Sequence, residues 1–535
     1  MVHDVLRGTP RWLASREALL RTDAYWPAAH PESGPTAPLS VVEGRSGEQQ
    51  RWWTRLWSFF IEPRNVVVVG AVVLYVLWFA TQSLKIFNEY ASPPFDLAIF
   101  DQGLWLITHF KAPFVTVMGR NLFGDHTSFI LLLFAPFYRI FPEPQGLLVL
   151  QTLLLASGAW PIYLIARRYA GSGPATMLAL AYLLNPMLQQ GNLDQFHPEA
   201  FGVPLVSIAV YAVLESRTGL FVVSALLILM VKEDAALLVV PLGLWFALRR
   251  DRRVGLGVVL GAVAWAMAAN WLIIPAFLGA ASMYAGYVPF GGVGGLLGTL
   301  VHRPGQLVAY LVSQGRPFYL WQVASTVGLS FLVAPEVALL SVLVVAENEI
   351  SSLGYMHQIV YQFSMMLAPL VVMAAAYAVI RQRSRRRQIL LATLSLCAAL
   401  WSCAVWGLAP FSATTIYTAP AQTVQSYATI EAALPADAVV SAIWPMVAHI
   451  DHSTHVYLWP TPFDAQYYGQ PSQSGTRLPV ADDVRYLILP IPLGPDNSPQ
   501  VFAQIASQFR LVRAAAGLGL YERIGRLAGD ARRLR

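Results

Sequence analysis

The sequence contains very little cysteine, lysine or charge. Charged side chains make up 12% of its 535 residues, about half the share that is usual in soluble domains. Hydrophobic residues make up 56%, and the mean hydropathy is +0.51, so no single water-soluble core could bury the apolar surface. The composition excludes a cytosolic enzyme, a disordered protein and a small secreted domain. It predicts a polytopic membrane protein with a soluble appendage.

The scarcity of cysteine and lysine narrows the interpretation further. Two cysteines, Cys397 and Cys403, exclude a disulfide framework and a cysteine-rich zinc site. Lysine occurs only at Lys85, Lys111 and Lys232, so the net charge of +6 comes from arginine clusters beside apolar segments. Clusters in that position report membrane topology and give no indication of nucleic-acid binding.

Long apolar runs begin near Asn65, too far into the chain for a cleavable signal peptide. Residues 1–64 precede them and are expected to form a cytoplasmic, largely disordered tail, because they are rich in Pro, Gly, Ser and Arg. We expect about eleven transmembrane helices, some of them short: residues 65–84, 146–166, 174–190, 200–214, 219–231, 235–248, 255–278, 317–333, 334–347, 359–380 and 388–409.

The arginine clusters predict the orientation of these helices. With a cytoplasmic N-terminus, every dense cluster falls on the inner side, as the positive-inside rule requires: residues 45–64, 167–168, 217, 249–253 and 381–387. Counting the apolar stretch 126–141 as a span would reverse this pattern, so we expect it to be a re-entrant or interfacial helix on the outer side. The prediction is a multi-pass protein of the cytoplasmic (inner) membrane, with a first outer loop over residues 85–145.

The transmembrane domain is expected over residues 65–409, and residues 410–535 change character. Charges increase there, and short alternating runs predict strands that alternate with a helix over residues 423–434. The strands are expected at residues 438–442, 455–459, 484–489 and 518–523. We therefore expect a small α/β domain on the extracytoplasmic side.

Nearly all acidic, histidine and amide groups of the membrane region fall in the outer connections. The sequence places FDLAIFDQ at residues 95–102, GDHT at 124–127, NLDQFHPE at 192–199 and KED at 232–234. Charged groups near a bilayer cost about 2.5–3.5 kcal/mol each at a helix centre, so they must face water or one another. We expect one polar cavity that opens toward the outer leaflet. Because ionisable residues are nearly absent from the helix centres, chemistry or binding at the membrane surface is favoured over transport.

These motifs carry a resemblance to a known family. FDLAIFDQGLW, GDHTSFILLLFAPFYRI, NLDQFHPEAFGVPL, VKEDAAL, HSTHVYLWP and GLGLYERI resemble a prokaryotic family of polytopic membrane proteins long labelled as of unknown function. That family in turn resembles the GT-C superfamily of integral membrane glycosyltransferases. The stretch MHQIVYQFSMMLAPL departs from the family pattern, in which a histidine would directly precede Tyr361.

The resemblance implies a GT-C-like fold and an inverting glycosyltransferase. Such an enzyme transfers a sugar from a polyprenyl-phosphate donor to a glycan, lipid or protein acceptor on the outer face of the membrane. It implies that the bilayer is a partner and that nucleic acid is not. A lipid or solute transporter or flippase, and a non-catalytic sensor or assembly factor, are the alternative functions.

Two aspartates of the first outer loop are the candidates for the general base. The base must take the proton of the acceptor hydroxyl as it attacks the anomeric carbon. Asp96 is the first candidate, because related enzymes carry their acidic residue at this distance from the first span, and Asp101 is the second. Asp96 also follows two prolines, so capping of a helix is the alternative role.

The remaining outer polar residues are candidates for binding the donor phosphate. An arginine fork or a lysine stabilises phosphate charge, and interfacial snorkelling or internal ion pairing is the alternative role. No cofactor is certain; a divalent cation such as Mg²⁺, Mn²⁺ or Ca²⁺ is a candidate, with Asp125, His126 and Glu199 as its ligands or, alternatively, as solvated loop groups. The candidate substrate-binding residues are His197, Glu199, Lys232, Glu233, Asp234, Arg303, Arg316 and His357.

Overall fold

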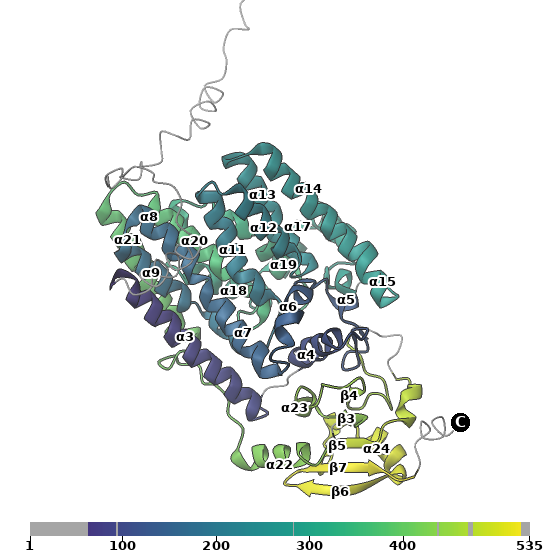
Figure 1. The fold of residues 1–535 in the computed structure, drawn as a ribbon. Helices are drawn as coiled ribbons and strands as arrows, with labels where there is room; N and C mark the ends of the chain where they lie inside the picture. The colour runs from purple at the N-terminus through teal and green to yellow at the C-terminus, as the bar shows by residue number, and fades with distance from the viewer. Residues whose placement is uncertain (1–62, 92–94, 282, 436–437, 469–474, 526–535) are drawn as a thin grey trace, which may run out of the picture.

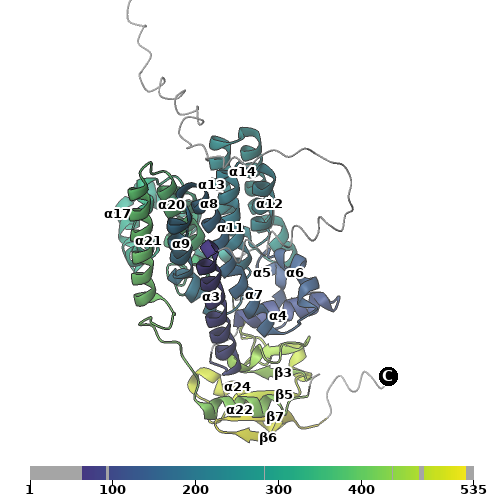
Figure 2. The same ribbon diagram turned by 60° about the vertical axis from the view of Figure 1, so that its left-hand side comes forward.

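The computed structural model describes residues 63–91, 95–281, 283–435, 438–468 and 475–525, so the expected tail lies almost wholly outside the described residues. A helical bundle forms one part of the molecule, and a β-sheet lies at one end of it (Figures 1 and 2). The helices of the bundle are α3 (Pro63–Asn88), α7 (Pro144–Ser157), α8 (Ala159–Ala170), α9 (Ser172–Leu183), α10 (Pro186–Leu193), α11 (Glu199–Leu214), α12 (Thr218–Leu229), α13 (Ala236–Arg249), α14 (Arg252–Ala268), α15 (Ile274–Leu278), α16 (Val293–His302), α17 (Pro304–Leu311), α18 (Arg316–Ser325), α19 (Val342–Ile350), α20 (Leu367–Ile380) and α21 (Arg385–Trp406).

Within the described residues, five helical stretches are long and apolar enough to cross a membrane: Asn65–Asn88, Pro144–Ala170, Arg252–Leu278, Gln362–Ile380 and Arg385–Trp406. Each coincides with an expected span. Three further apolar helices are shorter, namely α11, α12 and α16. The fold is therefore that of a helical membrane protein, and the number of eleven crossings stays a prediction.

Two expected spans, 317–333 and 334–347, form broken segments rather than continuous helices. Helix α18 has ten residues and α19 has nine, and the 3-10 turns Ser330–Val333 and Ala338–Ser341 lie between them. The two segments form a hairpin, because Arg316 Nε at the start donates to the carbonyl of Glu349 at 2.7 Å. The turn of the hairpin carries Glu336, which meets the arginines of other helices.

The arginine clusters come together at a single end of the bundle. Glu336 Oε1 lies 3.4 Å from Arg249 Nη2 and 3.0 Å from Arg381 Nη1. Arg250 donates to the carbonyls of residues 213 and 214, and Arg168 pairs with Glu215. The predicted grouping is confirmed for these clusters, and the side of the membrane that they face stays a prediction.

The first outer loop folds over the opposite end of the bundle (Figure 1). Its elements are α4 (Phe95–Thr108), β1 (Phe114–Val115), β2 (Arg120–Asn121), α5 (Leu122–Asp125) and α6 (Ile130–Tyr138). Helix α6 has nine residues, which gives a length of about 14 Å. It is too short to cross a bilayer, in agreement with its expected exclusion from the spans.

The C-terminal part contains a five-stranded mixed sheet. Its strand order is β4-β3-β5-β7-β6, with β3 parallel to β4 and β5, and β7 antiparallel to β5 and β6. The four expected strands and the expected helix are present, and β6 is an additional strand. The elements are α22 (Ala421–Glu431), β3 (Val440–Ala442), α23 (Trp444–Val447), β4 (Val456–Leu458), β5 (Tyr486–Pro490), α24 (Pro499–Ile505), β6 (Phe509–Ala515) and β7 (Leu518–Arg523).

The sheet and the first outer loop share a hydrophobic core. One buried cluster contains Leu97 and Leu104 of α4, Met118 between β1 and β2, and Val440 and Ile488 of the sheet. Burial of such side chains contributes about 1.5–3 kcal/mol each. Because this core joins α4 to the sheet, the C-terminal part fixes the position of the helix that carries Asp96.

Candidate functional site

An aspartate and a histidine meet where α4 faces the bundle. Asp96 lies in the first turn of α4, and its Oδ2 is 3.4 Å from Nε2 of His197, in the loop before α11. The backbone amide of His197 donates to Gln151 Oε1 at 2.9 Å, which fixes this loop on α7. The side chain of Asp96 is 44% exposed, whereas that of His197 is 4% exposed. An accessible carboxylate is thus paired with a buried imidazole.

The charge of His197 follows from its neighbours. Burial by itself lowers the pKa of the imidazole, but the carboxylates of Asp96, Asp194 and Glu199 outweigh it and raise that pKa to about 9. His197 is therefore a cation at neutral pH. Burial also raises the pKa of Asp194 to about 7, against the opposing effect of His197. Asp194 was not among the predicted site residues, although the motif NLDQFHPE contains it.

Lys232 and two carboxylates form a second charged group, beside the pair of Asp96 and His197. Lys232 Nζ lies 3.3 Å from Glu199 Oε1 and 3.2 Å from Asp234 Oδ2. The three side chains line a small recess, together with Glu347, Asn348 and Phe363 among others. The internal ion pair, one of the two expectations for Lys232, is thus present, and its role in binding phosphate stays a prediction.

Glu233 turns away from Lys232 and binds His126. His126 Nδ1 lies 2.7 Å from Glu233 Oε1, and the backbone amide of Thr127 donates to Glu233 Oε2 at 3.2 Å. Tyr284 contacts His126 Nε2 through its hydroxyl at 2.9 Å. The structure therefore holds the outer motifs GDHT and KED together.

The predicted cation site at Asp125, His126 and Glu199 is wrong. Asp125 accepts hydrogen bonds from the Tyr284 and Tyr468 hydroxyls at 3.1 and 3.2 Å, and Arg120 lies 3.5 Å away. Glu199 is paired with Lys232 instead. Protein donors therefore already occupy these carboxylates, and the three residues do not form a set of ligands among the described residues.

The structure does not present Arg316 as an open phosphate ligand, contrary to the prediction. Arg316 is completely buried, and its guanidinium donates to the carbonyls of Glu349 and Ser351 at 2.7 and 3.0 Å and to Gln314 Oε1 at 2.9 Å. A guanidinium whose donors are bound in this way stabilises the α18–α19 hairpin. Interfacial snorkelling, the alternative, is excluded by the same burial.

Arg303 and His357 lie outside the polar groups around Asp96 and Lys232. Arg303 is exposed between α16 and α17. His357 is 5% exposed, and burial together with the charge of Arg316 lowers the pKa of its imidazole. Its environment is thus that of the hairpin, and its predicted role as a phosphate ligand finds no support in the geometry.

Asp101 is separated from Asp96 by the helix itself. Five residues along an α-helix correspond to a rotation of about 140°, and Asp101 is fully buried on the side that faces α6 and the C-terminal part. Its Oδ1 accepts from the Tyr138 hydroxyl at 2.6 Å, and its Oδ2 lies 2.7 Å from His452 Nε2. Asp101 is therefore not accessible to an acceptor hydroxyl, and its prediction as the alternative base is wrong.

The solved structures that the chain resembles include an ArnT and an oligosaccharyltransferase. The chain is 13% identical to ArnT from Cupriavidus metallidurans, solved in complex with undecaprenyl phosphate, over 86% of this chain and 99% of that chain, with a TM-score of 0.47. It is 13% identical to the Archaeoglobus fulgidus oligosaccharyltransferase, solved in complex with Zn and sulfate, over 85% of this chain and 73% of that chain, with a TM-score of 0.37. No curated protein matches the chain.

A family model gives a match over most of the sequence. The model is described as a predicted membrane protein (DUF2079), and it matches residues 90–487. The match includes the outer motifs from FDLAIFDQ to HSTHVYLWP, as the resemblance led us to expect. The chain belongs to this family of predicted membrane proteins.

Proposed function

We propose that the protein is an inverting membrane glycosyltransferase that takes its sugar from a polyprenyl-phosphate donor on the outer face of the membrane. The observation that carries the proposal is the pair of Asp96 and His197. Asp96 offers an accessible carboxylate, and the buried cationic His197 holds it in place. A carboxylate of this kind is suited to accept a proton within a confined polar site.

The chemical step needs a base for the acceptor hydroxyl and a positive charge near the leaving phosphate. The acceptor hydroxyl oxygen forms a bond to the anomeric carbon while the bond from that carbon to the phosphate oxygen breaks. The hydroxyl proton passes to Asp96, and polyprenyl phosphate leaves with the electron pair. In this proposal Lys232, on the wall of the recess that it shares with Glu199 and Asp234, stabilises the leaving phosphate.

The lipid chain of the donor requires an apolar surface near Asp96. A second, small recess lies between α3, α4 and α7 and is lined mainly by apolar side chains that include Phe87, Leu97 and Leu148. Leu97 directly follows Asp96 in the sequence. This recess is the proposed site for the first part of the prenyl chain.

The direct test is release of polyprenyl phosphate by the purified full-length protein. With a set of radiolabelled polyprenyl-phosphate sugars and membrane extract as the acceptor source, we expect turnover with one class of sugar. Asp96→Asn should lower that turnover by a factor of about 10² or more. Asp496→Asn is the matched control, because Asp496 is exposed in the C-terminal part, and it should retain full turnover.

Two results would contradict the proposal. Turnover that is equal in the wild type and in Asp96→Asn would remove Asp96 from the chemistry. Movement of lipid-linked sugar across a vesicle membrane, without sugar transfer and unchanged in Asp96→Asn, would identify a flippase instead.

A further inference from the structure

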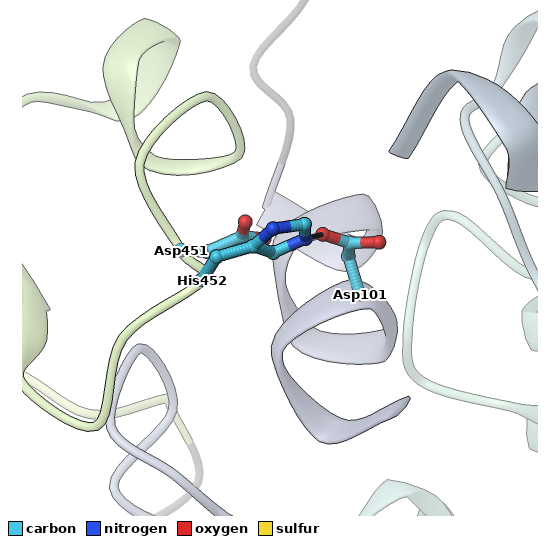
Figure 3. Close-up of side chains that lie close together, drawn as sticks. All are labelled: Asp101, Asp451 and His452. Atoms are coloured by element: carbon cyan, nitrogen blue, oxygen red, sulfur yellow. Dashed lines mark hydrogen bonds and ion pairs between the residues drawn. The ribbon is translucent and has the colours of Figure 1, made fainter. Parts of the chain in front are cut away.

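Two buried carboxylates and a histidine meet where α4 contacts the C-terminal part (Figure 3). Asp101 comes from α4, whereas Asp451 and His452 come from the loop between α23 and β4. One nitrogen or oxygen atom from each of the three side chains lies within 4.8 Å of the other two. The residues are brought together from positions 351 residues apart in the sequence.

Hydrogen bonds between uncharged groups hold the loop between α23 and β4 against α4. Gln102 Nε2 donates to the carbonyl of Ser453 at 2.7 Å and to Thr116 Oγ1 at 3.0 Å. Thr116 Oγ1 donates in turn to the carbonyl of Val456 at 2.6 Å. The three side chains are thus positioned by a rigid framework, which is what a ligand site requires.

Within this group Asp101 pairs with the His452 imidazole, and no lysine or arginine among the described residues adds a further positive charge. Asp101 is 0% exposed and Asp451 is 1% exposed. In the part of the chain that the structure describes, Asp451 Oδ2 has no hydrogen-bond partner. Two buried carboxylates with one imidazole between them are costly unless a proton or a cation compensates for their charge.

We propose that Asp101, Asp451 and His452 bind one divalent transition-metal ion, most suitably Zn²⁺, which ties α4 to the C-terminal part. Two carboxylate oxygens and one imidazole nitrogen are a ligand set that Zn²⁺ accepts. Mg²⁺ and Ca²⁺ prefer oxygen ligands alone and suit the site less well. The His452 side chain is 31% exposed, which leaves room for a water molecule as the fourth ligand.

The geometry needs a small adjustment to accept the ion. Zinc-to-ligand distances of about 2.0–2.2 Å place tetrahedral ligands about 3.3–3.6 Å apart. The present 2.7 Å between Asp101 Oδ2 and His452 Nε2 must therefore open by about 0.6–0.9 Å. The Tyr138 hydroxyl donates to the other oxygen of Asp101 at 2.6 Å and lies 3.2 Å from His452 Nε2, so it contacts two of the proposed ligands and helps to orient them.

The test is binding of Zn²⁺ alone to the full-length protein in detergent after removal of metal with a chelator. Titration calorimetry and metal counting should give one ion per chain at this site. Asp451→Asn and His452→Gln should each lose this ion, and Tyr138→Phe should weaken binding about tenfold. His455→Gln is the matched control, because His455 is an exposed histidine of the same loop outside the three-residue group, and it should bind as the wild type does.

Misfolding can be separated from loss of a ligand. Asp451→Asn removes one uncompensated buried charge, so its metal-free thermal midpoint should equal or exceed that of the metal-free wild type. Added Zn²⁺ should then raise the midpoint of the wild type and leave that of Asp451→Asn unchanged. Equal zinc binding by the wild type and both ligand variants would overturn the proposal. So would the absence of binding at millimolar Zn²⁺, which would mean that a shared proton compensates for the carboxylates.

Discussion

The charge of His197 makes a quantitative prediction about stability and pH. The folded protein raises the pKa of His197 from 6.5 to about 9. Each tenfold step in proton affinity is worth about 1.4 kcal/mol, so protonated His197 contributes about 3 kcal/mol to the free energy of unfolding. This corresponds to a factor of about 300 in the unfolding equilibrium constant.

The sign of the pH dependence follows from the direction of the pKa change. Because the folded-state pKa is the higher one, the contribution is complete below pH 6.5 and disappears as the pH rises through 9. Replacement by His197→Gln removes the titrating group. The stability difference between the wild type and His197→Gln should therefore shrink by about 3 kcal/mol between pH 6 and pH 10.

The assay is reversible unfolding in mixed micelles at pH 6, 8 and 10, with both proteins measured in parallel. Groups that titrate in both proteins cancel in the difference. His302→Gln is the control, because His302 is exposed at the end of α16, and its difference from the wild type should not change with pH. If the free energies of unfolding of the wild type and His197→Gln changed in parallel across this pH range, His197 would not be a buried cation in the folded protein. Asp96 would then have no positive charge beside it.

Three further predictions concern stability. Lys232→Met should lower the free energy of unfolding by about 3–5 kcal/mol, because it leaves the buried carboxylate of Glu199 and the partly exposed one of Asp234 without their cation; denaturant titration measures this loss, and near-wild-type stability would contradict the pairing. Arg316→Lys should cost about 1–3 kcal/mol, since an ammonium group cannot reach all the carbonyls that the guanidinium serves; a thermal midpoint equal to that of the wild type would contradict its structural role. Gly255→Ala should cost about 1–3 kcal/mol, because the added methyl group would collide with the Ala247 backbone where α13 packs on α14; Gly257→Ala, at a position with open space, should have little effect on the same midpoint.

The sequence predicts those features that depend on local pattern and on membrane topology. The five long spans, the grouping of arginines at one end and four strands of the sheet follow from apolar runs, positive charge and alternation. The meeting of Asp96 with His197 also follows, because both lie in connections that the predicted topology places at the same face.

The features that the sequence does not predict depend on side-chain direction and on long-range packing. Asp101 is the second candidate base from the sequence, but the rotation of α4 turns it toward His452. Arg316 was expected at the membrane interface, whereas the hairpin of α18 and α19 buries it against backbone carbonyls. The partners of Asp101 lie 351 residues away in a separate motif, and no local pattern links them.

The central claim is that the Asp96 site opens to the outer face of the membrane, opposite the arginine end. The most direct measurement is labelling of single cysteines in intact cells with a membrane-impermeant maleimide, in a background that lacks Cys397 and Cys403. Asp96→Cys and His455→Cys should be labelled in intact cells, whereas Arg253→Cys, exposed at the arginine end, should be labelled only after permeabilisation. Labelling of Arg253→Cys in intact cells, with Asp96→Cys protected until permeabilisation, would contradict the account.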